Sequence, residues 1–454
     1  MMTLLRWLPR FRAAGQMMRE MEARERWSRP EIEAFQLDRL NRLWGHARIA
    51  IPYYSRLTAE HRLPDRFHSL ADYENRMPVL PRVEVRDRPD DFLSPDRKPG
   101  SWALTGGTTG MPMRVYWENA AHLETLRARY RFLQARGIDI FARCAFLWGH
   151  ANSYQRGLTG LLARLRKVTS DWLRNRIRLC AYDLGRSDLR RHLDRIAAFG
   201  PVWLYGYSRA TDLLAQEALA SHFECPSLRL AVLTAEPATP AIVHNVERGL
   251  KVQAVVEYGS IDCGVLAAEG DDRLLHVRED LVHLETAPRA DGRYDLLVTV
   301  LNNPSFPLLR YQIGDVTETP LIRPERGMSR LPSVVGRQND ILVTRTGRLV
   351  HATRLDTLFK VETEQVRRFQ VHQYTDGSVI ATLDMLGPTN QPEVLRLERI
   401  LTEIVEGFPV EVRPVGDITL TEAGKQRAVV SELDRGWANG PRQPALPVTA
   451  TGRT

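Results

Sequence analysis

The pattern of apolar residues between positions 100 and 320 constrains the fold of this chain more than any other feature. Short apolar runs alternate there with segments whose apolar residues recur every three or four positions. The predicted strands are Cys144–Trp148, Val202–Tyr205, Leu230–Thr234, Val252–Val256 and Asp295–Val300. The predicted helices are Ala120–Ala135, Asp188–Phe199, Ala210–His222 and Pro240–Arg248. Such alternation predicts an α/β body with a largely parallel sheet.

The pattern changes at both ends of this body, and it divides the chain into four predicted parts. Residues 1–60 form a helical segment, in which a helix at Glu31–Ala47 ends before Pro52. Residues 61–338 form the large domain, which closes with a loop at Arg323–Pro332. From Ile341 the order strand, helix, strand, helix, strand predicts a small α+β domain over residues 339–434. Residues 435–454 have few large apolar groups and are expected to be a disordered tail.

Composition excludes several classes of protein. The chain has 454 residues, 43% of them hydrophobic and 26% charged, which is ordinary for a globular enzyme. Its four cysteines include no CxxC pair, which indicates a reduced compartment and no disulfide framework. The net charge of +8 is spread along the chain without aromatic interleaving, so we expect no nucleic-acid partner.

The N-terminus does not predict export. No apolar run reaches the roughly 20 residues that span a bilayer, and Pro9, Arg10 and Arg12 interrupt the first apolar stretch too early for a signal peptide. We therefore expect a cytoplasmic protein. Leucines and arginines on one early helix leave peripheral membrane contact through residues 1–20 open, beside the alternative that this helix packs on the main body. A homodimer is also left open.

A glycine- and threonine-rich loop is the strongest local signal for chemistry. It consists of Thr105, Gly106, Gly107, Thr108, Thr109 and Gly110, followed by Met111 and Pro112. Free backbone N–H groups and hydroxyls suit a polyphosphate. The loop lacks the GK[ST] of a P-loop, and it stands between strand-like Trp102–Leu104 and Met113–Tyr116. We expect the tip of a hairpin that binds phosphate.

This loop resembles the phosphate-binding signature of the adenylate-forming superfamily, and further blocks follow in that family's order. The blocks are Ala235-Glu-Pro237, Glu257-Tyr-Gly-Ser-Ile-Asp262, Arg310-Tyr-Gln-Ile-Gly-Asp315, Gly336-Arg-Gln-Asn-Asp340 and Ala423-Gly-Lys425. Ile51–Ser55, Trp203–Ser208 and Leu275–Val282 resemble the phenylacetate–CoA ligase branch, especially its relatives in capsular polysaccharide biosynthesis. The resemblance covers about residues 30–433 and implies a large α/β body made of several subdomains with a small, mobile α+β C-terminal domain.

The resemblance implies an enzyme that joins a carboxylic acid to AMP and then transfers the acyl group, with coenzyme A as the acceptor. A carrier-protein thiol, a sugar amine or a sugar hydroxyl stays open as an acceptor. Asp315 and Arg337 are expected at the ribose, and Tyr258 at the adenine. The other expected nucleotide contacts are Thr105, Gly106, Gly107, Thr108, Thr109, Gly110, Ala235, Glu236, Pro237, Glu257, Gly259 and Ser260.

Three residues have expected roles in catalysis or domain motion. Lys425 is expected to bridge the carboxylate and the α-phosphate, and only five lysines occur in the chain. Asp262 stands where the family has the glutamate that holds Mg²⁺, and carboxylate oxygens suit that ion. Asp340 is expected to be the hinge about which the C-terminal domain rotates.

The sequence says less about the identity of the acid substrate and about bound metal ions. Trp148, His150, Tyr205 and Tyr207 are guessed to line an acyl pocket that would accept an aromatic acid. Met111 removes a cation that many relatives have as lysine. Cys263 and His276 are too few for a zinc site, so no zinc is expected.

Two other classes compete with this interpretation. Gly206-Tyr-Ser208 follows a strand and opens a helix, as in the nucleophile elbow of an α/β hydrolase. However, the last glycine of that motif is missing, and Ser208 also suits the N-cap of the helix that follows. The second alternative is a catalytically impaired relative that binds at a membrane surface in polysaccharide biosynthesis. It is motivated by Asp262, Met111 and the basic N-terminus.

Overall fold

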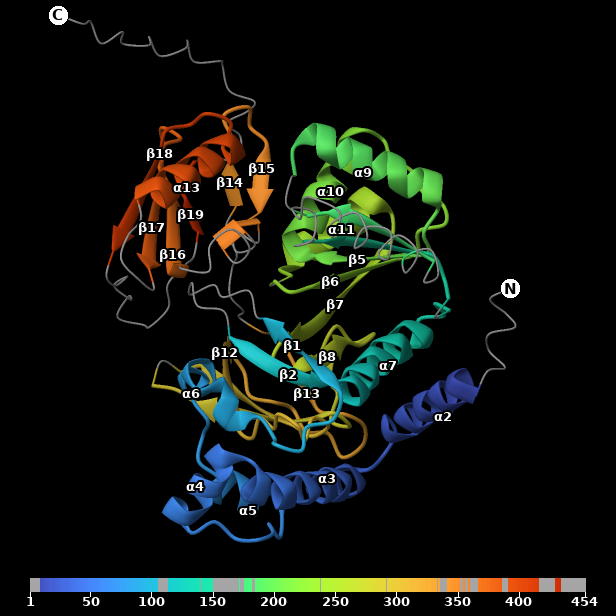
Figure 1. Ribbon diagram of the computed structural model, residues 1–454. Coiled ribbons are helices and arrows are strands. Elements are labelled where there is room, and N and C mark those ends of the chain that lie inside the picture. The colour runs from blue at the N-terminus through green and yellow to red at the C-terminus, as the bar shows by residue number, and fades with distance from the viewer. Residues whose placement is uncertain are drawn as a thin grey trace, which may run out of the picture.

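The structure is a computed structural model (Figure 1). It describes residues 9–104, 113–139, 141–149, 171, 175–181, 184–236, 238–290, 292–332, 334, 341–351, 354–355, 358–359, 366–385, 391–415 and 429–433. Among these residues, no helix combines the length and the apolar character that a membrane crossing requires.

A mixed eight-stranded sheet forms the centre of the molecule. Its strand order is β13-β9-β8-β7-β6-β5-β3-β4. The parallel strands are β3 (Cys144–Trp148), β4 (Arg176–Cys180), β5 (Trp203–Tyr207), β6 (Leu230–Thr234) and β7 (Gln253–Ser260). The antiparallel extension consists of β8 (Gly264–Glu269), β9 (Leu275–Val277) and β13 (Arg330–Leu331). The carboxyl ends of β3, β5, β6 and β7 therefore share one edge.

Helices cover both faces of the parallel strands because successive side chains of a strand point to opposite faces. The helices that contact one another on one face are α9 (Arg186–Phe199), α10 (Ser208–Ala220) and α11 (Pro240–Leu250), as Figure 1 shows. Leu204 and Leu233 belong to the core on that side. Trp203 and Val232 pack instead with Phe132 of α7 (Asn119–Ala135). Such two-sided burial is typical of parallel sheets.

A second layer lies below the parallel strands in Figure 1. It contains the antiparallel hairpin of β1 (Gly100–Leu104) and β2 (Arg114–Glu118), in which Leu104 pairs with Arg114. It also contains the antiparallel sheet of β10 (Val282–Pro288), β11 (Tyr294–Val300) and β12 (Tyr311–Thr317). Since β1 and β2 pair up to the ends of the Thr105–Pro112 segment, the predicted hairpin is present around a tip that lies outside the described residues.

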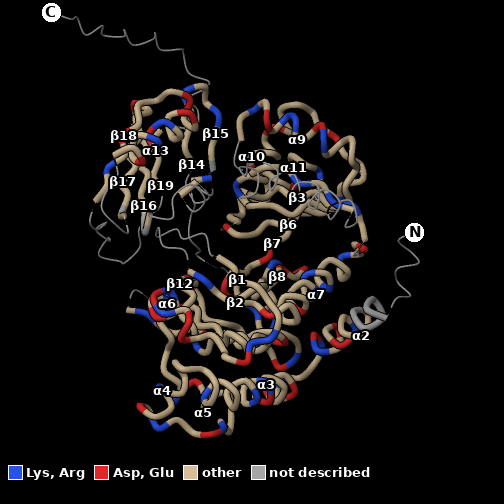
Figure 2. Tube along the Cα trace, in the orientation of Figure 1, with Lys and Arg blue, Asp and Glu red and all other residues tan. Residues whose placement is uncertain are grey.

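The N-terminal helices share a hydrophobic core with this second layer, and the first of them also contacts α7. They are α2 (Pro9–Arg24), α3 (Arg29–Ala50), α4 (Pro52–His61), α5 (Leu70–Arg76), α6 (Arg82–Asp87) and the 3₁₀ turn Pro89–Phe92. Arg29 at the start of α3 forms two parallel hydrogen bonds with buried Glu279, at 2.7 and 2.8 Å. Figure 2 shows acidic and basic residues interspersed along α2 and α3, in agreement with the dispersed charge of the sequence.

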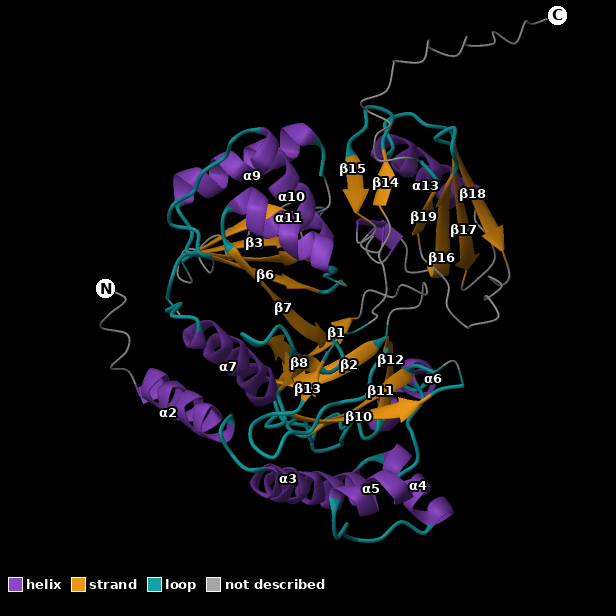
Figure 3. Ribbon diagram, turned by 180° about the vertical axis from the view of Figure 1, so that it is seen from behind, coloured by secondary structure: helices purple, strands orange, loops and turns teal. Residues whose placement is uncertain are grey.

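The C-terminal elements form a separate group, seen from behind in Figure 3. A four-stranded sheet has the order β18-β17-β16-β19, formed by Val410–Val415, Val379–Met385, Val366–Gln373 and Val429–Ser431. Helix α13 (Gln391–Ile404) packs on it through Leu397 and Leu401. A hairpin of β14 (Ile341–Val343) and β15 (Leu349–His351) precedes it.

Several sequence predictions need correction. The C-terminal strands occur as pairs rather than as single strands between helices, because hairpins join β14 to β15 and β16 to β17. Pro52 does end α3, but it also begins α4, since the fixed backbone angle of proline suits the first turn of a helix. The predicted loop Arg323–Pro332 contains the short strand β13. Helix α10 begins at Ser208 itself, and its N-cap is Tyr207.

Candidate active site

One large cavity opens at the carboxyl ends of the parallel strands, between them and the second layer. Its volume is about 1260 Å³. Residues of β3, β5, β6, β7, α7 and β12 line it, including Trp148, Tyr205, Thr234, Tyr258 and Asp315. In open α/β sheets, ligands bind at this edge. The cavity is larger than the 300–1,000 Å³ of a common small-molecule site, so it has room for two ligands or one extended ligand.

Two of the sequence blocks meet at one end of the cavity. Tyr258, on β7, donates a hydrogen bond of 3.0 Å to Oδ2 of Asp315, on β12. Burial, together with the Asp315 charge, holds the pKa of Tyr258 well above its usual value. The tyrosine therefore stays protonated and acts as a donor. Gly314, with φ of +88°, supplies the left-handed backbone before Asp315, a conformation that glycine adopts without strain.

The turn after β6 forms another wall of the cavity. Ala235 has φ of +66°, which is strained for a residue with a side chain. The backbone oxygen of Glu236 accepts a 2.9 Å hydrogen bond from Ser208, and the Glu236 carboxylate accepts one from the N–H of Arg209. These bonds join the turn to the start of α10 and hold its backbone against the cavity. Strained backbone of this kind is common at binding sites.

Asp262 lies in the cavity wall, but its carboxylate is already engaged. Oδ2 accepts hydrogen bonds from Nη1 of Arg82 at 2.5 Å and from the Tyr311 hydroxyl at 2.7 Å. Burial alone would raise the pKa of Asp262, but the Arg82 charge and bonds from Ser260 and Tyr311 lower it. An ionised carboxylate that is neutralised by arginine is a poor metal ligand as it stands. The metal role of Asp262 stays a prediction, and this ion pair is the observation against it.

The described residues contain no group of three or more histidine, cysteine or acidic residues that could hold a metal ion. Cys263 is buried in the core of the second layer, and its N–H donates to Ser260. His276 pairs with Asp272 at 2.9 Å. The absence of zinc stays a prediction, as does the presence of Mg²⁺.

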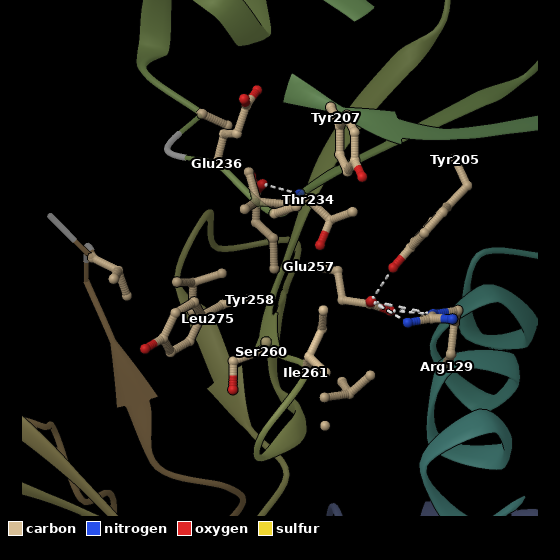
Figure 4. A pocket seen from close by; sticks show the side chains of 18 of the residues that line it. Arg129, Tyr205, Tyr207, Thr234, Glu236, Glu257, Tyr258, Ser260, Ile261 and Leu275 are labelled. Atoms are coloured by element: carbon tan, nitrogen blue, oxygen red, sulfur yellow. Dashed lines mark hydrogen bonds and ion pairs between the residues drawn. The ribbon is translucent and has the colours of Figure 1, made fainter. Parts of the chain in front are cut away.

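A buried ion pair, shown in Figure 4, lies on the opposite side of strand β7 from Tyr258. Nη2 and Nε of Arg129, on α7, donate to the Glu257 carboxylate at 2.7 and 2.8 Å, and the Tyr205 hydroxyl donates to the same carboxylate at 2.7 Å. Burial alone would lower the pKa of Arg129, but the Glu257 charge raises it. Glu257 is therefore held by protein groups, away from the Tyr258–Asp315 contact. Its predicted nucleotide role stays untested.

Aromatic rings gather beside this ion pair. Trp148 stacks on Tyr205 with ring centroids 5.5 Å apart, and it lies 4.3 Å from Tyr207. Phe146 contacts Tyr205 at 5.1 Å. The structure thus places the three described residues of the guessed acyl pocket in one cluster. It adds Phe146 and Arg129, which sequence reasoning missed because neither stands in a recognisable motif.

Other predicted site residues fall outside the described residues. They are Thr105, Gly106, Gly107, Thr108, Thr109, Gly110, Met111, His150, Pro237, Arg337, Asp340 and Lys425. Gly259 and Ser260 are described and line the cavity. A side chain at position 259 would lie 2.4 Å from the backbone oxygen of Gly264, so the close approach of β7 and β8 requires glycine there.

Ser208 is not arranged as a nucleophile. Its side chain is fully buried, and its hydroxyl donates to the backbone oxygen of Glu236. It therefore connects the start of α10 to the turn after β6, a role that needs no catalytic base. This geometry disfavours the hydrolase alternative.

Comparison with solved structures defines the fold, and comparison with curated proteins shows which branch of the superfamily the chain resembles. A solved structure of 2-hydroxyisobutyryl-CoA ligase, in complex with 2-HIB-AMP and CoA, matches 92% of this chain and 93% of its own, with a TM-score of 0.61 and 18% identity. The same ligase in the postadenylation state matches with a TM-score of 0.58. The fold is accordingly the α/β fold of the adenylate-forming CoA ligases, with a large body and a smaller C-terminal region.

Curated relatives narrow the resemblance. Phenylacetate-coenzyme A ligase of Thermus thermophilus is 28% identical over 88% of this chain and 97% of its own length. Protein CapK of Staphylococcus aureus is 20% identical over 89% of this chain and 90% of its own length. No family model matches the chain. These relatives confirm the resemblance to the phenylacetate–CoA ligase and capsule-biosynthesis branch.

Proposed function

We propose that the protein activates a carboxylic acid with ATP and then passes the acyl group to the thiol of coenzyme A. In the first step, a carboxylate oxygen attacks the α-phosphorus of ATP and pyrophosphate leaves. In the second step, the thiol attacks the acyl carbonyl and AMP leaves. The relatives named as CoA ligases support an acid–thiol ligase, and the solved neighbour that holds 2-HIB-AMP and CoA supports this order of events.

The observation that carries the proposal is the Tyr258–Asp315 contact inside the large cavity. Two blocks that are 57 positions apart in sequence converge there on one polar end. Asp315 would accept hydrogen bonds from the two ribose hydroxyls, since a carboxylate has two acceptor oxygens. Tyr258 would hold Asp315 in place and present its ring to the adenine. Both reactants are anionic, so catalysis would rest on positioning and charge neutralisation.

The remaining roles stay proposals. The Thr105–Gly110 loop would bind the phosphates, Arg337 the ribose and α-phosphate side, and Lys425 the carboxylate and the α-phosphate. Asp340 would be the hinge between the two steps. Because Asp262 is paired with Arg82, no catalytic step is assigned to a metal bound there, and Mg²⁺ is proposed only as the counter-ion of the ATP phosphates. A carrier-protein thiol remains the second acceptor to test, and a cytoplasmic location is proposed with the function.

Product analysis tests the proposal. The protein is incubated with Mg·ATP, coenzyme A and a panel of aliphatic, hydroxy and aromatic acids, and AMP, pyrophosphate and thioester are quantified. We expect equal amounts of the three products with at least one acid. Formation of ADP and phosphate, or turnover that does not depend on any acid, would contradict an AMP-forming ligase. Failure to form any product would favour the non-catalytic alternative.

A further inference from the structure

The Arg129–Glu257 pair has hydrogen-bonding capacity that the described protein does not use. Nε and Nη2 of Arg129 bind Glu257, whereas Nη1 has no partner among the described residues. The Glu257 side chain is only 2% exposed, but 22% of the Arg129 side chain remains exposed, and Arg129 lines the cavity. The part of the pair that reaches the cavity therefore belongs to Arg129, and Nη1 is the guanidinium nitrogen that Glu257 does not occupy.

The surroundings of this donor are mostly aromatic. The guanidinium carbon of Arg129 lies 4.5 Å from the centre of the Tyr205 ring, and Trp148 stacks on Tyr205 with an angle of 21° between the rings. Phe146 and Tyr207 complete the cluster. A planar ligand that stacks here would gain from ring contacts and would exclude water from the guanidinium edge.

The cost of removing water from Arg129 determines which ligands the site prefers. A ligand with an oxygen at the right place would replace the water that hydrates Nη1 of Arg129, whereas a purely hydrocarbon ligand would remove that water and leave a buried donor without a partner. A site built around a polar group rejects analogues that lack the matching group more strongly than an apolar pocket rejects a missing methylene. Among the described residues, Arg176 and Arg178 both line the cavity and share the carboxylate of Asp171, so positive charge in this wall disfavours cationic substituents.

We propose that the acid substrate is an aromatic acid that carries an oxygen substituent, such as a hydroxyl group, and that Arg129 recognises this oxygen. The inference rests on the proposed function, because it takes the acyl group to occupy the part of the cavity away from Tyr258 and Asp315. Glu257 acts as a positioning residue, since it fixes the orientation of the guanidinium through two of its nitrogens. Tyr205 fixes Glu257 in turn and donates its hydroxyl proton to it.

Equilibrium binding to the full chain tests the proposal independently of catalysis. Calorimetry compares matched acids: phenylacetate with its 2-, 3- and 4-hydroxy derivatives, benzoate with its hydroxy derivatives, and cyclohexylacetate as the non-aromatic member. We expect one hydroxylated aromatic acid to bind roughly 10- to 100-fold more tightly than its parent, the scale of a hydrogen bond to a charged group. The non-aromatic acid should bind more weakly than phenylacetate.

The double variant Arg129→Leu/Glu257→Leu removes both charges together, a change that buried ion pairs tolerate better than loss of one partner. It should reduce the preference for the hydroxylated acid over its parent to near unity. If this variant fails to fold, Arg129→Lys decides, because a lysine keeps the charge beside Glu257 but loses the planar fork, and the preference should fall. The matched control is Arg289→Gln/Asp295→Asn, which removes an ion pair outside the cavity and should keep the preference.

The outcomes separate this inference from the proposed function. A wild-type preference below about threefold, a double variant that keeps the preference, or no binding of any aromatic acid overturns the inference. AMP formation with aliphatic acids alone also overturns it while the proposed function stands. Selective binding without AMP formation supports the recognition site and contradicts the proposed function.

Discussion

Replacement of Arg82 by methionine tests whether Asp262 is an anchor for arginine in the ligand-free protein. The variant removes the charged partner from a carboxylate whose side chain is 2% exposed, whereas Arg82 itself is 24% exposed. Loss of one partner from a buried ion pair costs about 3–5 kcal/mol. Because Tyr311 and Ser260 still bind the carboxylate, we expect a loss of free energy of unfolding near the lower limit, about 3 kcal/mol.

The loss of stability in Arg82→Met should depend on pH, because Arg82 affects the pKa of Asp262. In the wild type, Arg82 helps to keep the pKa of Asp262 below its usual value, so the pair stabilises the fold at neutral pH and this contribution is lost as pH falls through the lowered pKa. Without Arg82, burial dominates and raises the pKa of Asp262. The carboxyl group then takes up a proton more readily in the folded state, so the deficit of the variant should shrink as pH falls from 7 toward 4.

Urea unfolding of the ligand-free protein at pH 7 and at pH 5 measures this. The control is Arg88→Met, which removes an exposed arginine paired with Glu84 and should change stability by less than about 0.5 kcal/mol. The double variant Arg82→Met/Asp262→Asn should recover part of the loss, because the unpaired charge is gone. The reasoning fails if Arg82→Met costs no more than Arg88→Met, or if the double variant is no more stable than the single one.

Three further predictions concern Lys425, His192 and Ser208. Lys425→Ala should slow adenylation on the order of 10²–10³-fold, the scale for one preorganised charge contact, while thioester formation from supplied adenylate continues; equal loss of both steps in single-turnover assays would refute the role. Burial lowers the pKa of His192 below 6.5, and its Nε2 lies 2.9 Å from the Cys180 carbonyl oxygen, so stability should fall as pH drops below 6.5; His192→Gln should flatten this part of a thermal-unfolding pH profile, and an unchanged profile would argue otherwise. Ser208 should resist a fluorophosphonate probe, as mass spectrometry can check, and labelling there would restore the hydrolase alternative.

Local pattern predicted the strands well and the contacts between them poorly. β3 and β6 have the predicted bounds because each is a continuous apolar run in the parallel part of the sheet. The hairpin around Thr105–Pro112 was readable because two strand-like runs flank a glycine-rich segment. The C-terminal region was harder to predict, since the strands of its hairpins follow one another without a helix between them.

The parts of the site that the sequence did not predict depend on contacts between residues far apart in the chain. Arg82 and Asp262 are 180 positions apart, and Arg129 and Glu257 are 128 apart, so no local pattern pairs them. The family motif indicated a metal at Asp262, whereas the folded chain brings an arginine of α6 to the same carboxylate. The motif gave the place of the residue in the cavity, and tertiary packing determined its partner.

Calorimetric titration with Mg·ATP tests the central claim most directly, because it asks whether the cavity end formed by Tyr258 and Asp315 holds a nucleotide. The account predicts that the wild type binds Mg·ATP, that Asp315→Ala weakens binding at least about tenfold through lost hydrogen bonds to the ribose, and that Asp295→Ala, outside the cavity, leaves it unchanged. Equal affinity of the wild type and Asp315→Ala, or no heat of binding with the wild type, would contradict it.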